Sequence, residues 1–166
     1  MDYVGPLFRA LNPLWAKEPL SGAGAAKFGG RFNPKGTPAL YTSLRPETAI
    51  REANQVGSFQ PITLVSYRAA ITNIFDGLDE ALLARHVLTA KLLANPGWRD
   101  AMVSGQLART HQLALDLIAA GYNGLIVPSF APGSGADDRN LILWTWSFVP
   151  PAELHLIDDE NRLRPM

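Results

Sequence analysis

Apolar and polar positions alternate in several short segments of the 166-residue chain, and each alternation predicts a strand. In PALYTS, residues 38–43, the alternation covers a short strand, and Pro46 then suits the first turn of a helix that should end near Gln55. PITLVSYRA at 61–69 and ITNIF at 71–75 are rich in β-branched and aromatic residues, which favour strands. The first half of the chain therefore reads as a strand, a helix and two further strands.

The apolar period becomes helical in the middle of the chain. Apolar residues recur at helical spacing from Leu78 to Val87, and NPG at 95–97 is expected to end this helix. A second helix should follow and end at Gly121. We therefore expect two helices between the early and the late strands.

Strand character returns in the last third of the sequence. GLIVPS at 124–129 and NLILWTWSFV at 140–149 are apolar and β-branched, and the weaker alternation of LHLI at 154–157 predicts an edge strand. Strands, a helical middle and further strands predict an α+β fold with a mixed or antiparallel β core. The sequence shows no internal repeat and no linker, so we expect a single domain over residues 1–166.

Amino-acid composition indicates where loops lie and excludes several classes of function. Fourteen glycines and 13 prolines concentrate in residues 19–38 and 128–135, which should form irregular loops. Fifteen basic and 15 acidic residues balance, so no strong field recruits nucleic acid or an anionic membrane. Cysteine is absent, which excludes a thiol nucleophile. No run of ~18 apolar residues and no leader pattern occurs, so we expect a cytoplasmic protein.

Arg31 is the first candidate functional residue, because it follows two glycines and precedes a turn in GGRFNP, residues 29–34. Such a turn restricts the backbone, and a guanidinium donates hydrogen bonds in a planar fork that suits phosphate or carboxylate. We interpret Arg31 as an anion clamp, with a surface ion pair as the alternative. The preceding GAGAAKFGG, 22–30, lacks the ending of a P-loop and is either a flexible loop or a loop that closes over a substrate.

Glu52 and Tyr41 are candidates from the strand and helix that follow. Glu52 borders the apolar helix face that contains Ala49 and Ala53, so its carboxylate should be only partly solvated. It is either a solvated or salt-bridged glutamate or a catalytic carboxylate that stabilises positive charge on a sugar carbon or binds a ribose hydroxyl. Tyr41 is either a core aromatic or a ring that stacks on a ligand.

Two polar residues of the later loops complete the candidates. Ser129 follows Pro128 and is either a turn residue or a group that positions substrate, without the Gly-x-Ser-x-Gly context of an acyl-transfer nucleophile. Asn140 ends the polar segment DDRN, and its amide could bridge a loop and Ser129 or a ligand. The three histidines lie in unrelated segments, so we expect no metal site.

These segments together resemble the RES domain, a family named for its Arg, Glu and Ser. LFRA, GGRFNPKGTPALYTS, PETAIREA and GYNGLIVPSF through DDRNLILW occur in this order over almost the whole chain. Phe32 stands where many members carry tryptophan, which should change packing more than chemistry. The functional positions of the family fall on Arg31, Tyr41, Glu52, Ser129 and Asn140.

The resemblance implies the toxin of a bacterial type II toxin-antitoxin pair, similar to ADP-ribosyltransferase toxins and using NAD⁺ as substrate without a metal. It implies a cognate antitoxin as partner, with a helix-turn-helix DNA-binding domain. Glu52 would be catalytic together with Arg31, Tyr41 and Ser129, and NAD⁺ would bind Arg31, Tyr41, Ser129 and Asn140.

The acceptor of ADP-ribose stays open in the sequence. We favour a side chain of a cellular protein, which would make the chain a mono-ADP-ribosyltransferase. Water or phosphate as acceptor would instead make it an NAD⁺ glycohydrolase or phosphorylase that depletes NAD⁺. A non-enzymatic module that binds a partner through tryptophan-rich surface is the competing class.

Overall fold

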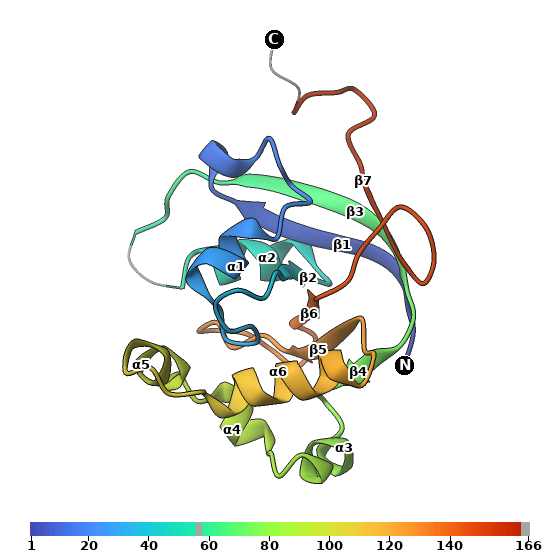
Figure 1. Ribbon diagram of the computed structural model, residues 1–166. Coiled ribbons are helices and arrows are strands. Elements are labelled where there is room, and N and C mark those ends of the chain that lie inside the picture. The colour runs from blue at the N-terminus through green and yellow to red at the C-terminus, as the bar shows by residue number, and fades with distance from the viewer. Residues whose placement is uncertain (56–57, 164–166) are drawn as a thin grey trace.

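A seven-stranded mixed sheet organises the fold, with strand order β4-β5-β6-β2-β1-β3-β7 (Figure 1). The computed structural model describes residues 1–55 and 58–163. Only β4 and β5 pair in parallel among the named strands, and the other neighbours are antiparallel. In chain order the elements are β1 (Tyr3–Leu11), the 3-10 helix η1 (Pro13–Trp15), α1 (Ala23–Phe28), β2 (Leu40–Ser43), α2 (Pro46–Ala53), β3 (Thr63–Ile71), β4 (Ile74–Asp76), α3 (Glu80–Arg85), α4 (Ala90–Ala94), α5 (Trp98–Val103), α6 (Arg109–Ala119), β5 (Gly124–Pro128), β6 (Arg139–Leu143) and β7 (Ala152–Leu156).

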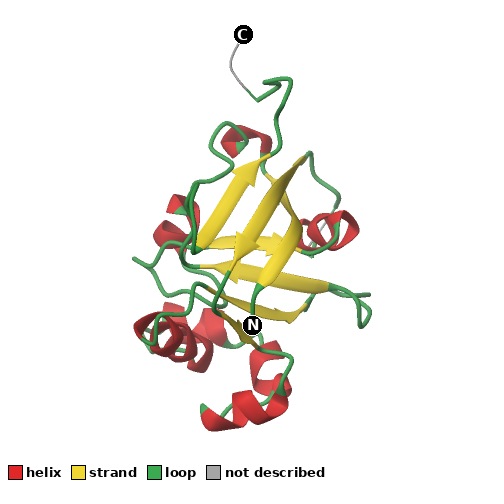
Figure 2. Ribbon diagram, turned by 90° about the vertical axis from the view of Figure 1, so that its right-hand side faces the viewer, coloured by secondary structure: helices red, strands yellow, loops and turns green. Residues whose placement is uncertain are grey.

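The sheet curls, because the strands at its two ends run in clearly different directions (Figure 2). Strand β5 is buried on both faces: Leu125 and Val127 pack under the helices, whereas Ile126 packs inside the curl. A strand buried on both faces needs a continuous apolar run, and GLIVP is one. The α+β class with a mixed β core is confirmed.

Two apolar clusters hold the two sides of this sheet. The cluster inside the curl joins residues of all seven strands, among them Leu7, Leu40, Val65, Tyr67, Ile74, Ile126, Leu141 and Leu154. The cluster between the sheet and helices α3, α4 and α6 contains Phe32, Phe75, Leu83, Leu93, Leu113, Leu117, Leu125 and Ile142. Figure 1 shows α3 to α6 gathered on the side of β4 and β5.

The helical middle of the chain holds four short helices, so the prediction of two helices was wrong in number. Val87 has φ 56° and separates α3 from α4, and Thr89 then caps α4 by accepting a hydrogen bond from the Leu92 N–H. Gly105, with φ 73°, lies between α5 and α6. Residues in the left-handed conformation and a new N-cap therefore break the helix, although the apolar period of the sequence continues across these breaks.

The N-terminal third contains three elements that the sequence pattern did not predict, β1, η1 and α1. Strand β1 lies inside the sheet and pairs with β3 along all nine residues, although Gly5 and Pro6 weaken its local strand signal. Residues 19–38, expected to be irregular, contain helix α1. A Cβ on Gly22 would lie 2.6 Å from the Trp146 ring, and Gly29 ends the helix at φ 73°. These glycines serve close packing and a turn.

The remaining predicted strands are present with shifted ends. Strand β6 ends at Leu143, because the backbone N–H groups of Trp144 and Thr145 both donate to the carbonyl of Asn123. Helix α2 begins at Pro46 as predicted, and β7 lies at the edge of the sheet. No helix in residues 1–55 and 58–163 is long and apolar enough to cross a membrane.

Candidate active site

The carboxylate of Glu52 on α2 accepts hydrogen bonds from two residues far away in the sequence. Oε1 accepts from Ser129 Oγ at 2.5 Å and from Asn140 Nδ2 at 2.5 Å. Gln55 Nε2 donates to Oε2 from the next turn of the chain. Hydrogen bonds to a charged acceptor are the stronger ones in proteins, so this carboxylate has a fixed orientation.

Strand pairing explains how Asn140 reaches Glu52. Asn140 lies opposite Ser43 in the β2–β6 register and opposite Val127 in the β5–β6 register. Ser43 Oγ donates to Asn140 Oδ1 at 2.7 Å. Because Oδ1 is engaged as an acceptor, the Nδ2 group of Asn140 faces Glu52 as a donor.

The loop between β5 and β6 brings Ser129 to the same carboxylate. The Ser129 N–H donates to the Asp138 carbonyl at 2.7 Å, which closes the loop at its base. Ser134 Oγ, from within the loop, lies 2.8 Å from Ser129 Oγ. This loop is the glycine- and proline-rich segment predicted at 128–135: Pro128 ends β5, and residues 129–135 contain no helix or strand.

Asp138 fastens this loop to helix α2. Its buried carboxylate accepts from Thr48 Oγ1 at 2.5 Å, from the Gly135 N–H at 2.8 Å and from Arg51 Nη1 at 2.8 Å. Hydrogen bonds from the Thr48 hydroxyl and the Gly135 N–H, with a smaller contribution from Arg51, hold the pKa of Asp138 below its ordinary value, and desolvation only partly opposes them. The helix that carries Glu52 and the loop that carries Ser129 are therefore fixed to each other.

Tyr41 lies on β2 with its hydroxyl engaged by the turn at 30–33. Its Oη accepts from the Phe32 N–H at 2.9 Å and donates to Asn33 Oδ1 at 2.7 Å. Burial raises the pKa of Tyr41, and the Phe32 N–H and the Arg31 charge only partly oppose this. A Cβ on Gly30 would lie 2.3 Å from Tyr41 Oη, so glycine is required at that position.

Arg31 projects from the same turn toward the C-terminal end of α4. Its Nη1 donates to the carbonyls of Leu93 and Asn95 at 2.9 and 3.0 Å, and its guanidinium lies 4.6 Å from the centre of the Phe130 ring. A cation is favourable at a helix C-terminus. Burial lowers the pKa of Arg31, whereas the charge of Glu52 raises it. The guanidinium of Arg31, interpreted from the sequence as an anion clamp, is hydrogen-bonded here to two backbone carbonyls and packs on the Phe130 ring.

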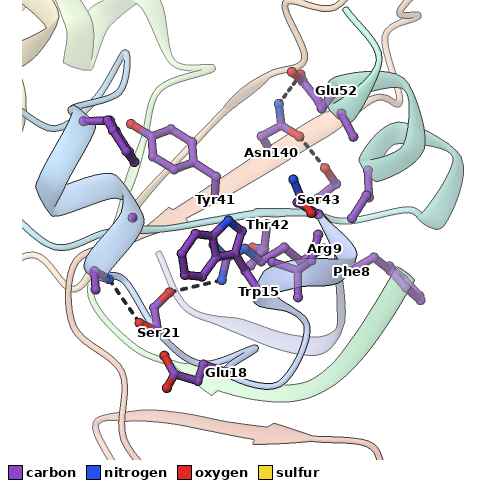
Figure 3. A pocket seen from close by; sticks show the side chains of 18 of the residues that line it. Phe8, Arg9, Trp15, Glu18, Ser21, Tyr41, Thr42, Ser43, Glu52 and Asn140 are labelled. Atoms are coloured by element: carbon purple, nitrogen blue, oxygen red, sulfur yellow. Dashed lines mark hydrogen bonds between the residues drawn. The ribbon is translucent and has the colours of Figure 1, made fainter. Parts of the chain in front are cut away.

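A cavity of about 760 Å³ opens beside these groups (Figure 3). Glu52, Asn140, Ser43 and Tyr41 are part of its wall, whereas Arg31 and Ser129 do not line it. Its volume is in the range typical of sites for small molecules, roughly 300–1,000 Å³. Its lining also includes Phe8, Arg9, Ala10, Leu11, Asn12, Trp15, Glu18, Ser21, Ala23, Gly24, Lys27, Phe28, Thr42, Ala49, Ala53 and Gln55.

The structure thus brings Glu52, Ser129 and Asn140 into direct contact. Sequence reasoning missed the supporting residues Ser43 and Asp138. Ser43 lies two positions after Tyr41 and so on the same face of β2, which is a usable signal. Asp138 carries no such local signal, because its partners on α2, Thr48 and Arg51, are 90 and 87 positions away in the chain. Within the described ranges, His, Asp and Glu side chains form no group of three that could hold a metal ion.

Comparison with known proteins identifies the family. The family model of the RES domain matches residues 6–163, so the chain belongs to the RES domain family. A chain in the crystal structure of the M. tuberculosis MbcT-MbcA toxin-antitoxin complex is similar in fold, with a TM-score of 0.62 and 18% sequence identity. The similarity covers 95% of this chain and 84% of that chain. No curated protein matches the sequence.

Proposed function

We infer that the chain is a toxin that cleaves NAD⁺ between nicotinamide and ribose and transfers ADP-ribose to an acceptor. Membership of the RES domain family supports this proposal, and so does the fold that the chain shares with a structure described as a toxin-antitoxin complex. The observation that carries it is the Glu52 carboxylate, held by Ser129 and Asn140 at the wall of a cavity of about 760 Å³.

In this proposal Glu52 faces the ribose carbon from which nicotinamide departs. Cleavage of that C–N bond leaves an oxocarbenium-like ribose, and a carboxylate stabilises the developing positive charge. The electron pair of the bond stays with nicotinamide, which leaves as a neutral ring, so no general acid is needed. One oriented carboxylate is therefore sufficient for the bond-breaking step, and the acceptor loses a proton as it bonds to C1.

Ser129, Asn140 and Tyr41 have supporting roles in this chemistry. Ser129 and Asn140 keep Oε1 of Glu52 in one position, so that little reorganisation is required when charge develops. Tyr41 offers its ring to the nicotinamide side of the cavity while its hydroxyl is held by Phe32 and Asn33. Arg31 is proposed to bind a phosphate of NAD⁺ with donors other than those held by Leu93 and Asn95.

A toxin of this kind needs an antitoxin, and we propose a cognate one that blocks access to the cavity. The transferred ADP-ribose goes either to a protein side chain, which we favour, or to water or phosphate. Both outcomes arrest growth, by modifying a target in the first case and by depleting NAD⁺ in the second.

Expression of the chain in bacteria tests the proposal. Wild type should arrest growth, and Glu52→Gln should not, because the amide cannot stabilise the developing charge. Mass spectrometry of the arrested cells then separates the acceptors: an ADP-ribosylated protein supports transfer, and free ADP-ribose with falling NAD⁺ supports the depleting enzyme. Growth arrest that is equal for both chains, with NAD⁺ unchanged, would favour the binding-module alternative.

A further inference from the structure

The cavity beside Glu52 extends to a second group of aromatic side chains, Trp15 and Phe28. Trp15 ends η1 and Phe28 ends α1, and both residues line the cavity. Trp15 is 67% exposed and Phe28 is 61% exposed. Neither ring belongs to the two apolar clusters of the core. Two large aromatic rings that line a cavity and do not pack in the core indicate a binding surface for a ligand.

The backbone on which these rings stand is well anchored. Arg9 on β1 donates to the carbonyls of Pro19 and Ser21, at 3.1 and 3.3 Å, and so attaches the segment between η1 and α1 to the sheet. The Asn12 side chain accepts from the Leu14 N–H and caps η1. Figure 3 shows Trp15, Tyr41 and Arg9 at the wall of the same cavity. The backbone that carries Trp15 and Phe28 is therefore held in place before a ligand binds.

Charge accompanies the aromatic rings in this part of the cavity. Lys27 is exposed, and its Nζ lies 5.2 Å from the centre of the Phe28 ring, so it brings a positive charge to this end of the cavity. Glu18 also lines the cavity and offers a carboxylate acceptor. An adenine nucleotide is recognised by three kinds of group: an aromatic surface for the base, a cation for the phosphate and an acceptor for the ribose hydroxyls.

We propose that Trp15 and Phe28 bind the adenine ring of NAD⁺, with Lys27 beside the adenosine phosphate. This inference rests on the proposed function, in which Glu52 and Tyr41 hold the nicotinamide half of the same molecule. The nicotinamide half uses one part of the cavity wall, and the AMP half requires a second aromatic surface. The adenine ring and the nicotinamide ring then occupy different parts of the same cavity.

Binding of AMP to the purified protein tests this subsite independently of any reaction. Calorimetry should show that wild type binds AMP and that Trp15→Ala and Phe28→Ala each weaken binding about ten-fold or more, the size of one lost base-stacking contact. Phe59→Ala is the matched control, because Phe59 is 69% exposed and does not line the cavity. It should bind AMP as wild type does. Both target rings are exposed, so their removal leaves the core intact.

Kinetics with NAD⁺ give the second measurement. Trp15→Ala should lower kcat/KM for NAD⁺ about ten-fold or more, and should leave kcat/KM for nicotinamide mononucleotide, which lacks the AMP half, close to wild type. Loss of AMP binding in the two variants would uphold the subsite even if wild type released no nicotinamide, and that result would overturn only the proposed function. AMP that does not bind wild type, or that binds the variants equally well, would overturn the subsite.

Discussion

Asn140 Nδ2 lies 2.5 Å from Oε1 of Glu52, across 88 positions of the chain. This contact joins the first residues of β6 to helix α2, and Ser43 fixes the orientation of the amide from the neighbouring strand. A catalytic carboxylate must be held near its productive geometry by groups whose own rotamers are fixed. The sheet therefore determines the position of the group on which the proposed chemistry depends.

Two substitutions of Asn140 distinguish a positioning role from a merely structural one. Asn140→Ala removes one charge-assisted hydrogen bond and should lower kcat about ten-fold or more at every pH. Asn140→Asp puts a second carboxylate against Glu52, and two such carboxylates cannot both ionise easily. Its activity should therefore rise toward alkaline pH, as the shared proton is lost. Equal pH–rate profiles for wild type and Asn140→Asp would contradict the role.

Arg31→Ala tests whether the arginine contacts substrate or only supports α4. If Arg31 binds a phosphate, the KM for NAD⁺ should rise about ten-fold or more, the size of a lost charge-assisted hydrogen bond. Arg31→Lys keeps the charge without the planar fork, so its KM for NAD⁺ should lie between the values of wild type and Arg31→Ala. An Arg31→Ala variant with the wild-type KM and a lower free energy of unfolding would assign the side chain to the α4 carbonyls alone.

Asp138 should make stability depend on acid pH. Its pKa in the folded chain lies below the ordinary value of 3.8, so its contribution is complete above that value. The contribution is lost as pH falls from about 4 through the lower folded pKa. Asp138→Asn should abolish this part of the pH dependence of the free energy of unfolding, measured with denaturant. Asp137→Asn, at an exposed neighbour, is the control and should unfold with the wild-type pH dependence.

Gly30 and Gly24 should respond in opposite ways to alanine. In Gly30→Ala the new Cβ would lie 2.3 Å from Tyr41 Oη and 2.6 Å from Asn33 Oδ1, so the turn must shift and stability must fall. In Gly24→Ala the Cβ meets nothing within 4 Å and lies in helix α1, where alanine is favoured by up to about 1 kcal/mol. Denaturant unfolding of both variants checks the contrast. A Gly30→Ala chain as stable as Gly24→Ala would contradict it.

The parts of this fold that depend on local pattern were predictable from sequence. Strand β2, the start of α2 at Pro46 and the buried strand β5 follow from alternation, a proline at the first helical turn and an apolar run. Strand β1 was missed, because its stability comes from pairing with β2 and β3 on either side. The breaks at Val87 and Gly105 were missed, because the apolar period runs across them.

The site shows the same division between local and distant information. Glu52 and Tyr41 were chosen from their own segments, but only the paired strands and the closed loop bring Ser129 and Asn140 to Glu52. The bonds of Arg31 to Leu93 and Asn95 span more than 60 positions, so no motif around residue 31 indicates them. Sequence pattern selects residue types, and tertiary pairing determines their partners.

Nicotinamide release from NAD⁺ by the purified chain is the most direct test of the central claim. Wild type should release nicotinamide, and Glu52→Gln should reduce the rate at least about a hundred-fold, since it removes the charge that stabilises the transition state. Glu47→Gln, at an exposed position of the same helix, is the matched control and should keep the wild-type rate. Each protein is assayed with and without cell lysate, so that an acceptor is always present in one arm. Wild type that releases no nicotinamide in either arm, or Glu52→Gln that releases it as fast as wild type, would contradict the account.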